Sequence, residues 1–253
     1  MSISGCRYFL IWTAFMGLLA GHGGCAEKAM PGPPNILWIT VEDMSPNMGC
    51  YGDPYAHTPH LDRLAKRSVR YNNAFATAPV CAPARSTIIT GMYAYSIGSH
   101  HMRSTGRFPD DLKYFPEYLR AAGYYCTNNH KEDYNLEYES ERIWDASGRD
   151  AHWSNRPQKD QPFFAIFNLH TTHESRVNGI DRHRQAIEQV PDSLLRAPGE
   201  VPLPPFYPDI PDVHTLWARY YNNITAMDMQ VGQLLAELKQ EGVEENTIVM
   251  FYS

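Results

Sequence analysis

The sequence predicts an α/β fold with a mostly parallel central sheet and helices on both faces. Three segments have near-continuous runs of branched and aromatic residues, as expected for strands buried on both faces: 35–41, 163–169 and 247–252. Segments with apolar residues at helical spacing lie between these runs. Alternation of the two patterns favours parallel strands joined by helical crossovers.

Composition sets the broad class of the protein. The chain has 253 residues, of which 43% are hydrophobic and 12% aromatic, enough for one large domain with a sizeable core. The net charge of -6 comes from interspersed acids and bases, without the clustered Lys and Arg stripe that phosphate contacts require. We therefore expect no nucleic-acid partner.

Residues 1–26 have the layout of a signal peptide. Arg7 precedes an apolar run over 8–20, and small residues follow up to Ala26. The run is shorter than the roughly 20 residues of a spanning helix, so we expect export to the periplasm or beyond and no stable membrane span. Lipid attachment through Cys25 is the less favoured alternative, because His22 stands where such sites carry an aliphatic residue. Residues 27–34 contain three prolines and predict a linker, with the folded part beginning at residue 35.

The first helices follow the strand at 35–41. Thr58 and Pro59 predict a helix start, with apolar or small residues at helical spacing as far as Ser68. Residues 83–90 predict a short helix closed by Gly91, which places Cys81 at a helix amino terminus.

The later elements follow the same logic. Residues 116–122 predict a helix ended by Gly123, and 124–127 predict a strand. Apolar residues step by three and four from 216 to 238, which predicts the longest helix. The polar, proline-rich stretch 175–211 predicts a surface insertion, and the aromatic and polar residues of 149–162 suggest a sugar subsite.

Polar residues follow three of the predicted strands. Glu42 and Asp43 follow the first strand, Lys131 follows the second, and His173 follows the strand at 163–169. Ligands of open α/β sheets bind beyond the carboxyl ends of strands. We therefore expect these side chains to meet at one edge of the sheet.

One motif carries a family resemblance. Cys81-Ala-Pro-Ala-Arg85, followed by Ser-Thr-Ile-Ile-Thr-Gly91, resembles the Cys-x-Pro-x-Arg signature of the type I, formylglycine-dependent sulfatases of the alkaline-phosphatase-like superfamily. The likeness extends from about residue 35 to Ser253 and includes the first strand with its acidic pair and the late helix with Met227-Asp228. It implies the sulfatase fold, with residues 35–253 as the amino-terminal portion of a catalytic domain whose carboxy-terminal part is missing.

The resemblance implies a role for each residue of the motif. In that family the cysteine, here Cys81, is oxidised by a formylglycine-generating maturation enzyme to an aldehyde, and Arg85 steadies it. The hydrated aldehyde then attacks sulfur. The alternative is a buried, inert cysteine.

The acidic pair resembles the carboxylates that bind a divalent cation, usually Ca²⁺, beside position 81. Hard carboxylate oxygens suit that ion, so Glu42, Asp43 and the group derived from Cys81 are the expected metal site. The family usually has two aspartates, and Glu42 departs from that pattern. An isolated Glu-Asp pair would be a solvated turn, but its place beyond a buried strand favours ligands.

Lys131 resembles the family's sulfate-contacting lysine. The family pattern there is Gly-Lys-x-His, whereas this chain has His130 before the lysine and Asp133 in place of the histidine. Either Asp133 substitutes in part for that histidine, or another one, such as His100 or His101, approaches from elsewhere.

His173 resembles a second sulfate-contacting histidine. An imidazole that donates a proton to the leaving alkoxide fits this role, and His170 is the alternative. A His-x-x-His metal site finds no further ligand of matching spacing.

Together these features predict a sulfuric ester hydrolase that cleaves an organic sulfate, with a sulfated carbohydrate as the expected substrate. Two alternatives stay open: an inactive, glycan-binding fragment, and a phosphoester or phosphonate hydrolase of the same superfamily. The family completes its cation site after a strand resembling 247–252, so the 253-residue chain is expected to be inactive by itself.

Overall fold

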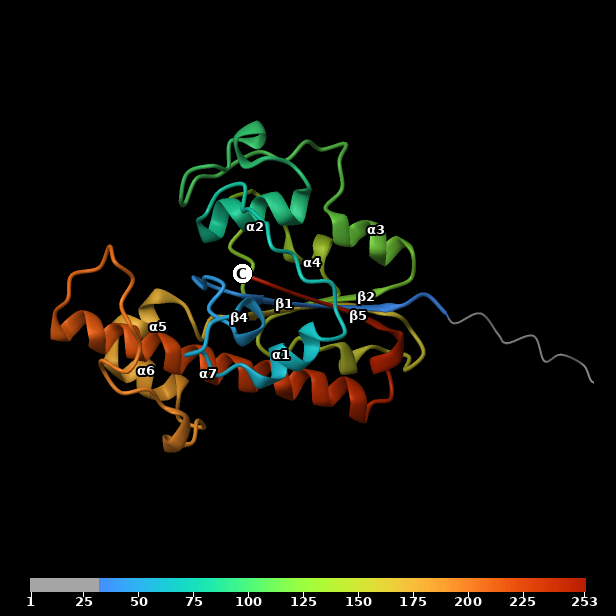
Figure 1. Cartoon of the computed structure of the whole chain (residues 1–253). Coiled ribbons are helices and arrows are strands. Elements are labelled where there is room, and N and C mark those ends of the chain that lie inside the picture. The colour runs from blue at the N-terminus through green and yellow to red at the C-terminus, as the bar shows by residue number, and fades with distance from the viewer. Residues whose placement is uncertain (1–31) are drawn as a thin grey trace, which may run out of the picture. The chain divides into compact units, whose positions relative to one another are not determined.

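A computed structural model describes residues 32–253, and the predicted signal peptide and most of the predicted linker lie outside them. The described part is built around a five-stranded sheet in the order β3-β2-β4-β1-β5, and every strand pair is parallel (Figure 1). The strands are β1 (Asn35–Val41), β2 (Tyr125–Asn129), β3 (Ala146–Ser147), β4 (Phe163–Leu169) and β5 (Thr247–Tyr252).

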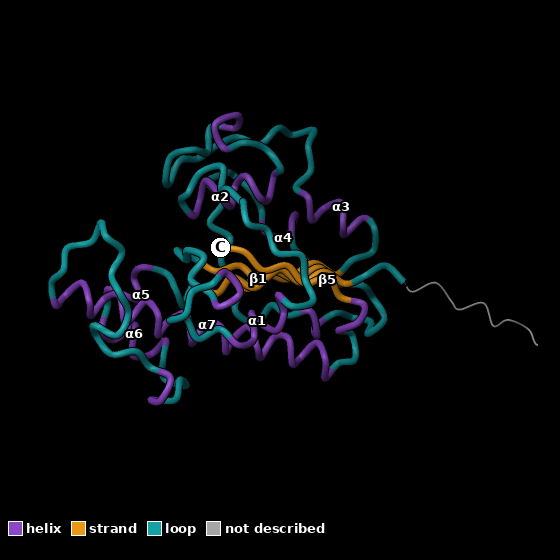
Figure 2. The backbone as a smooth tube through the Cα atoms, viewed as in Figure 1, coloured by secondary structure: helices purple, strands orange, loops and turns teal. Residues whose placement is uncertain are grey.

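Helices cover both faces of this sheet. The α-helices are α1 (Pro59–Ala65), α2 (Cys81–Thr90), α3 (Phe115–Ala121), α4 (Ser140–Ile143), α5 (Glu174–Asn178), α6 (Ile180–Ala186) and α7 (Pro211–Gln240). Short 3-10 turns lie at Gly49–Tyr51, Ala94–Ile97, Trp153–Asn155, Asp192–Leu194 and Glu244–Asn246. In Figure 2 the strands form a layer with α2, α3 and α4 on one side and α1 and α7 on the other. The predicted α/β fold with helices on both faces is confirmed.

The strongly apolar strands have their predicted bounds. β1, β4 and β5 coincide with the predicted segments, and β2 extends to Asn129. In β4 the residues Phe163, Ala165 and Phe167 pack toward α7, while Phe164 and Ile166 pack toward α2 and α3. Burial on both faces is why this strand has no alternating polar residues.

Two of the predicted helices differ most from their predicted bounds. α1 stops at Ala65 and does not continue to Ser68, while α7 begins several residues before its first predicted position. Thr58 precedes α1 but makes no side-chain cap. Asp228 of α7 takes that role instead, because its carboxylate accepts the N–H groups of His60 at 3.0 Å and Leu61 at 2.8 Å. A long-range partner thus satisfies the first N–H groups of α1.

The aromatic side chains of 149–162 do not form a sugar subsite. Trp153 is fully buried and packs on Phe163 and Phe167 of β4, with ring centroids 5.5 and 5.3 Å apart. A ring enclosed in this way has no face left for a saccharide, so Trp153 belongs to the core, while residues 157–160 of the same stretch are exposed.

The predicted insertion at 175–211 is more ordered than its composition suggests. It contains most of α5 and all of α6, and both helices pack against α7. The buried His183 of α6 is hydrogen bonded to Asn223 Oδ1 of α7 at 2.8 Å, and burial lowers the pKa of His183. This contact anchors α6. None of the helices within residues 32–253 has the length and apolar character needed to cross a bilayer.

Candidate active site

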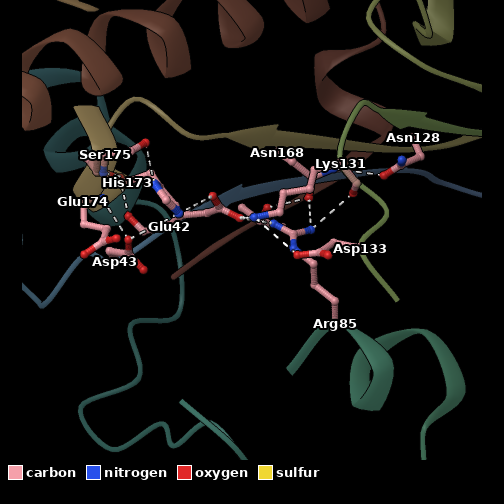
Figure 3. A network of polar contacts seen from close by, with 12 residues as sticks. Glu42, Asp43, Arg85, Asn128, Lys131, Asp133, Asn168, His173, Glu174 and Ser175 are labelled. Atoms are coloured by element: carbon pink, nitrogen blue, oxygen red, sulfur yellow. Dashed lines mark hydrogen bonds and ion pairs between the residues drawn. The ribbon is translucent and has the colours of Figure 1, made fainter. Parts of the chain in front are cut away.

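The predicted site residues gather beyond the carboxyl edge of the sheet. Glu42 and Asp43 follow β1, Lys131 follows β2, and His173 follows β4. Arg85 reaches them from α2 (Figure 3). The parallel strands bring these loops together, as expected for an α/β sheet.

Glu42 is the centre of the cluster. Its side chain is 6% exposed, and Oε1 accepts hydrogen bonds from Lys131 Nζ at 2.6 Å and Arg85 Nη2 at 2.9 Å. Burial alone would raise the pKa of Glu42, but the hydrogen bonds and charges of Lys131 and Arg85 outweigh it and lower that pKa. Glu42 is therefore ionised and orients both cations. The resemblance predicted that Glu42 binds a cation, and the sequence did not reveal this ion-pair role.

Asn168 fixes the guanidinium from the other side. Its Oδ1 accepts hydrogen bonds from Arg85 Nη1 at 2.6 Å and Thr40 Oγ1 at 2.9 Å. Its amide nitrogen donates to Asn128 Oδ1 at 2.9 Å and to the Asn129 carbonyl at 3.1 Å. Asn168 was missed in the sequence, although a lone amide near the end of the apolar strand 163–169 was a signal.

Cys81 lies in the first turn of α2. It is half-buried and free of disulfide bonds, four residues before Arg85 and therefore on the same helix face. The helix amino terminus has no side-chain cap, so its N–H groups can interact with an anion. Cys126, by contrast, lies fully buried in the core, where burial raises the pKa of its thiol.

Asp133 stands where the sulfatase pattern has a histidine, and its carboxylate lies between two basic side chains. Its carboxylate pairs with Arg103, and Asp133 Oδ2 lies 3.7 Å from Lys131 Nζ. His100 and His101 are exposed and contact each other, with ring centroids 4.2 Å apart. Neither of these histidines lines the cavity beside Lys131.

His173 has a defined ring orientation. Its Nδ1 accepts the Ser175 N–H at 3.2 Å, which caps α5, so the neutral ring carries its proton on Nε2. Nε2 lies 4.0 Å from Glu42 Oε2 and 3.9 Å from Asp43 Oδ2. The ring therefore presents an N–H donor to the acidic pair.

A cavity of about 450 Å³ opens beside this cluster. Glu42, Lys131 and His173 line one part of it. The remainder of the wall comprises His130, His170, Ser175, Arg176 and Arg182. His170 therefore shares the cavity with His173, and its ring centroid lies 4.8 Å from that of His130. The volume is in the range of small-molecule sites.

The acidic pair can supply part of a cation site. Glu42 Oε1 holds Arg85 and Lys131, and Asp43 Oδ2 accepts the Glu174 N–H at 2.9 Å, which leaves one oxygen of each carboxylate for a metal. Oxygen donors of this kind fit Ca²⁺, which takes about six to eight oxygens. Two free carboxylate oxygens are fewer than such an ion takes. The pair therefore fits a hard cation as a partial ligand set.

Replacing Asn168 by leucine is expected to lower turnover by about 10- to 100-fold, because Arg85 loses one of its two side-chain anchors. Stability should fall by about 1–3 kcal/mol, since the buried Thr40 hydroxyl and Asn128 amide lose their partner. Steady-state kinetics and chemical denaturation measure the two effects.

The matched control is Thr40→Val, which removes a hydrogen bond to the same Asn168 oxygen but leaves the Arg85 contact. It should lower stability and leave turnover within about threefold. Equal losses of turnover in both variants would contradict a specific role for the Asn168 to Arg85 bond.

Comparisons with known proteins identify relatives of the whole described region. The Sulfatase family model matches residues 34–142 and 125–253. An ulvan-active sulfatase of Formosa agariphila is 38% identical over 89% of this chain and 44% of its own length. The human N-sulphoglucosamine sulphohydrolase is 28% identical over 95% of this chain and 53% of its own length.

Solved structures share the fold. A 2-O GAG sulfatase superposes with a TM-score of 0.62 at 17% identity, covering 87% of this chain and 57% of that one. The phosphonate monoester hydrolase of Agrobacterium radiobacter has a TM-score of 0.59 at 16% identity, covering 86% and 62%. This chain thus spans about half the length of the curated relatives that it matches.

Proposed function

Because this chain belongs to the sulfatase family, we propose that it forms the nucleophile-bearing part of a sulfuric ester hydrolase acting on carbohydrate sulfates. One observation carries the proposal. Arg85 of the Cys81 motif and Lys131 share the Glu42 carboxylate, beside a cavity that His173 also lines. The cluster combines two fixed cations and a histidine at the carboxyl ends of the strands, and Cys81 lies one helical turn before Arg85 on α2.

The nucleophile is the first element of the proposed mechanism. Formylglycine made from Cys81 by a maturation enzyme supplies, as its hydrate, a hydroxyl group that can attack sulfur. The chain contributes the geometry around that position. Arg85 lies one helical turn further on the same face, and its two anchors, Glu42 and Asn168, hold the guanidinium in place. A fixed charge at this point lowers the cost of reorganisation during the reaction.

Charge on the sulfate oxygens is balanced by fixed cations. Lys131 Nζ is held at 2.6 Å from Glu42 Oε1, with 23% of its side chain exposed, so the ammonium can also face a ligand in the cavity. A divalent cation, with Ca²⁺ as the expected ion, would supply further positive charge, and Glu42 and Asp43 would hold it. Since these carboxylates are a partial ligand set, we expect the 253 residues alone to bind the ion weakly and to turn over little substrate.

Departure of the alcohol requires a proton. His173 offers an N–H at Nε2 because the Ser175 N–H occupies Nδ1. When the ring is protonated to imidazolium, Nε2 can pass a proton to the leaving alkoxide, and the ring returns to the neutral form. His170 lines the same cavity and is the second candidate for this role.

The relatives support a carbohydrate substrate, and the sequence favours a compartment outside the cytoplasm. The human relative is named for N-sulphoglucosamine, a sugar, and the sequence over 1–26 favours export, with lipid attachment at Cys25 as the alternative. We propose a sulfated saccharide as substrate and a formylglycine-generating enzyme as the partner in maturation.

The test is expression of the complete gene product with a maturation enzyme, followed by assays with an aryl sulfate, a sulfated saccharide and an aryl phosphate. We expect sulfate release from the first two substrates, and mass spectrometry should show an aldehyde at position 81. Preference for the phosphate would favour the phosphoester or phosphonate hydrolase, whose fold this chain also shares. An unmodified Cys81 with glycan binding but no turnover would favour the inactive fragment, for which the Asp133 to Arg103 pair is the supporting observation.

A further inference from the structure

One wall of the cavity is strongly basic. Arg176 of α5 and Arg182 of α6 line it together with His130 and His170. Glu42 is the acidic residue among those that line the cavity, and Lys131 and Arg85 already neutralise its charge. The cavity therefore has an excess of positive charge beyond what the Glu42 cluster balances.

The two arginines have no acidic partner within residues 32–253. Neither guanidinium forms a hydrogen bond or an ion pair with a described residue, although Arg176 is half-buried. Arg184, two residues after Arg182 on α6, pairs with Asp181 at 3.4 Å. A half-buried guanidinium that faces a cavity without a partner is suited to an anion from the ligand.

Both arginines lie on anchored helices. The Arg176 N–H donates to the His173 carbonyl at 2.8 Å, so Arg176 lies one turn after His173 on α5. Arg182 precedes the buried His183, which binds Asn223 of α7. The basic wall therefore has a fixed place relative to His173.

Burial, and after it nearby positive charge, lowers the pKa of both histidines of the wall. The pKa of His170 is lowered first by burial and then by the neighbouring His130 and Arg176. The pKa of His130 is likewise lowered by burial and by Arg149. An anion bound at Arg176 would offset its repulsion of a protonated His170, which agrees with a wall suited to a negative group.

We propose that Arg176 and Arg182 form a second anion-binding subsite, which takes a carboxylate or an additional sulfate of the same saccharide whose sulfate ester lies at Lys131 and His173. This inference rests on the proposed function and specifies its substrate class as a saccharide with two anionic groups. The cavity volume of about 450 Å³ is larger than one sulfate requires and accommodates a sugar unit as well.

The experiment uses the complete, matured enzyme and three saccharide substrates: a monosulfated neutral sugar, a disulfated sugar, and a monosulfated sugar with a uronic carboxylate. The variants are Arg176→Ala, Arg182→Ala and Arg176→Lys, with Arg184→Ala as the matched control on α6. We expect Arg176→Ala to lower kcat/KM for a two-anion substrate by about 10- to 100-fold relative to the neutral monosulfate, mainly through KM. Arg176→Lys should retain part of the preference, and Arg184→Ala should retain all of it.

The wild-type preference identifies the second anion, because a sulfate subsite favours the disulfated sugar and a carboxylate subsite favours the uronic sugar. Equal losses for all three saccharides, or no loss, would overturn the inference. Calorimetric binding of the disulfated and uronic sugars to Cys81→Ala provides a test without turnover. If Arg176→Ala weakens that binding by about tenfold or more, the subsite stands even where hydrolysis fails, and unchanged binding rejects it.

Discussion

Replacing Cys81 by alanine is expected to lower sulfate-ester hydrolysis by at least about a thousand-fold, because removal of a nucleophile leaves only the contribution of binding and fixed charge. The side chain is half-buried in the first turn of α2, so the free energy of unfolding should change by less than about 1 kcal/mol. Release of sulfate from an aryl sulfate, with chemical denaturation in parallel, measures both quantities.

Cys50→Ala is the matched control for this variant. Cys50 is also half-buried and free, but it packs against the core cluster beside α1, whereas Cys81 lies on α2 with Arg85. It should keep its turnover within about twofold. Retention of turnover in Cys81→Ala, or equal losses in the two variants, would contradict a nucleophile at position 81.

Lys131→Ala is expected to lower turnover by about 100- to 1000-fold, since a fixed positive charge beside the sulfate oxygens is lost. Stability should fall by about 1–3 kcal/mol, because the buried Glu42 carboxylate loses one of its two charged partners and keeps only the hydrogen bond to Arg85. The comparison of kcat/KM with the free energy of unfolding separates the two roles.

The exposed Lys159 gives the control, because it carries the same charge on the surface away from the cavity. Lys159→Ala should leave both turnover and stability within experimental error of the wild type. A Lys131→Ala variant with normal turnover would show that the ammonium serves Glu42 alone and does not act on the substrate.

The two departures from the family pattern have different structural settings. Glu42 holds Lys131 and Arg85 with Oε1. Its Oε2 lies 4.0 Å from His173 Nε2, beyond hydrogen-bond distance, so this oxygen remains available to a cation. Asp133 pairs with Arg103 and lies near Lys131, so it adds negative charge where the family has an imidazole. The nearby histidines that share the cavity are His130, His170 and His173.

Local patterns predicted the main elements because their causes are local. The strands 35–41, 163–169 and 247–252 are confirmed with their bounds, since burial on both faces requires continuous apolar runs. The helix start at Cys81 was predicted within two residues from its proline and the closing glycine. The two-residue strand β3 and the short helices α5 and α6 were missed, because such short elements depend on packing against their neighbours.

The sequence by itself determined the α/β class, the acidic pair beyond the first strand, the lysine beyond the second and the cysteine at a helix start. The tertiary structure decided which of these groups meet. Lys131 and Glu42 are 89 residues apart in the chain, and Arg85 and Asn168 are 83 apart. Their contacts follow from the strand order β3-β2-β4-β1-β5. This order makes β2, β4 and β1 neighbours, so the loops that follow their carboxyl ends meet. No local periodicity in the sequence encodes the strand order.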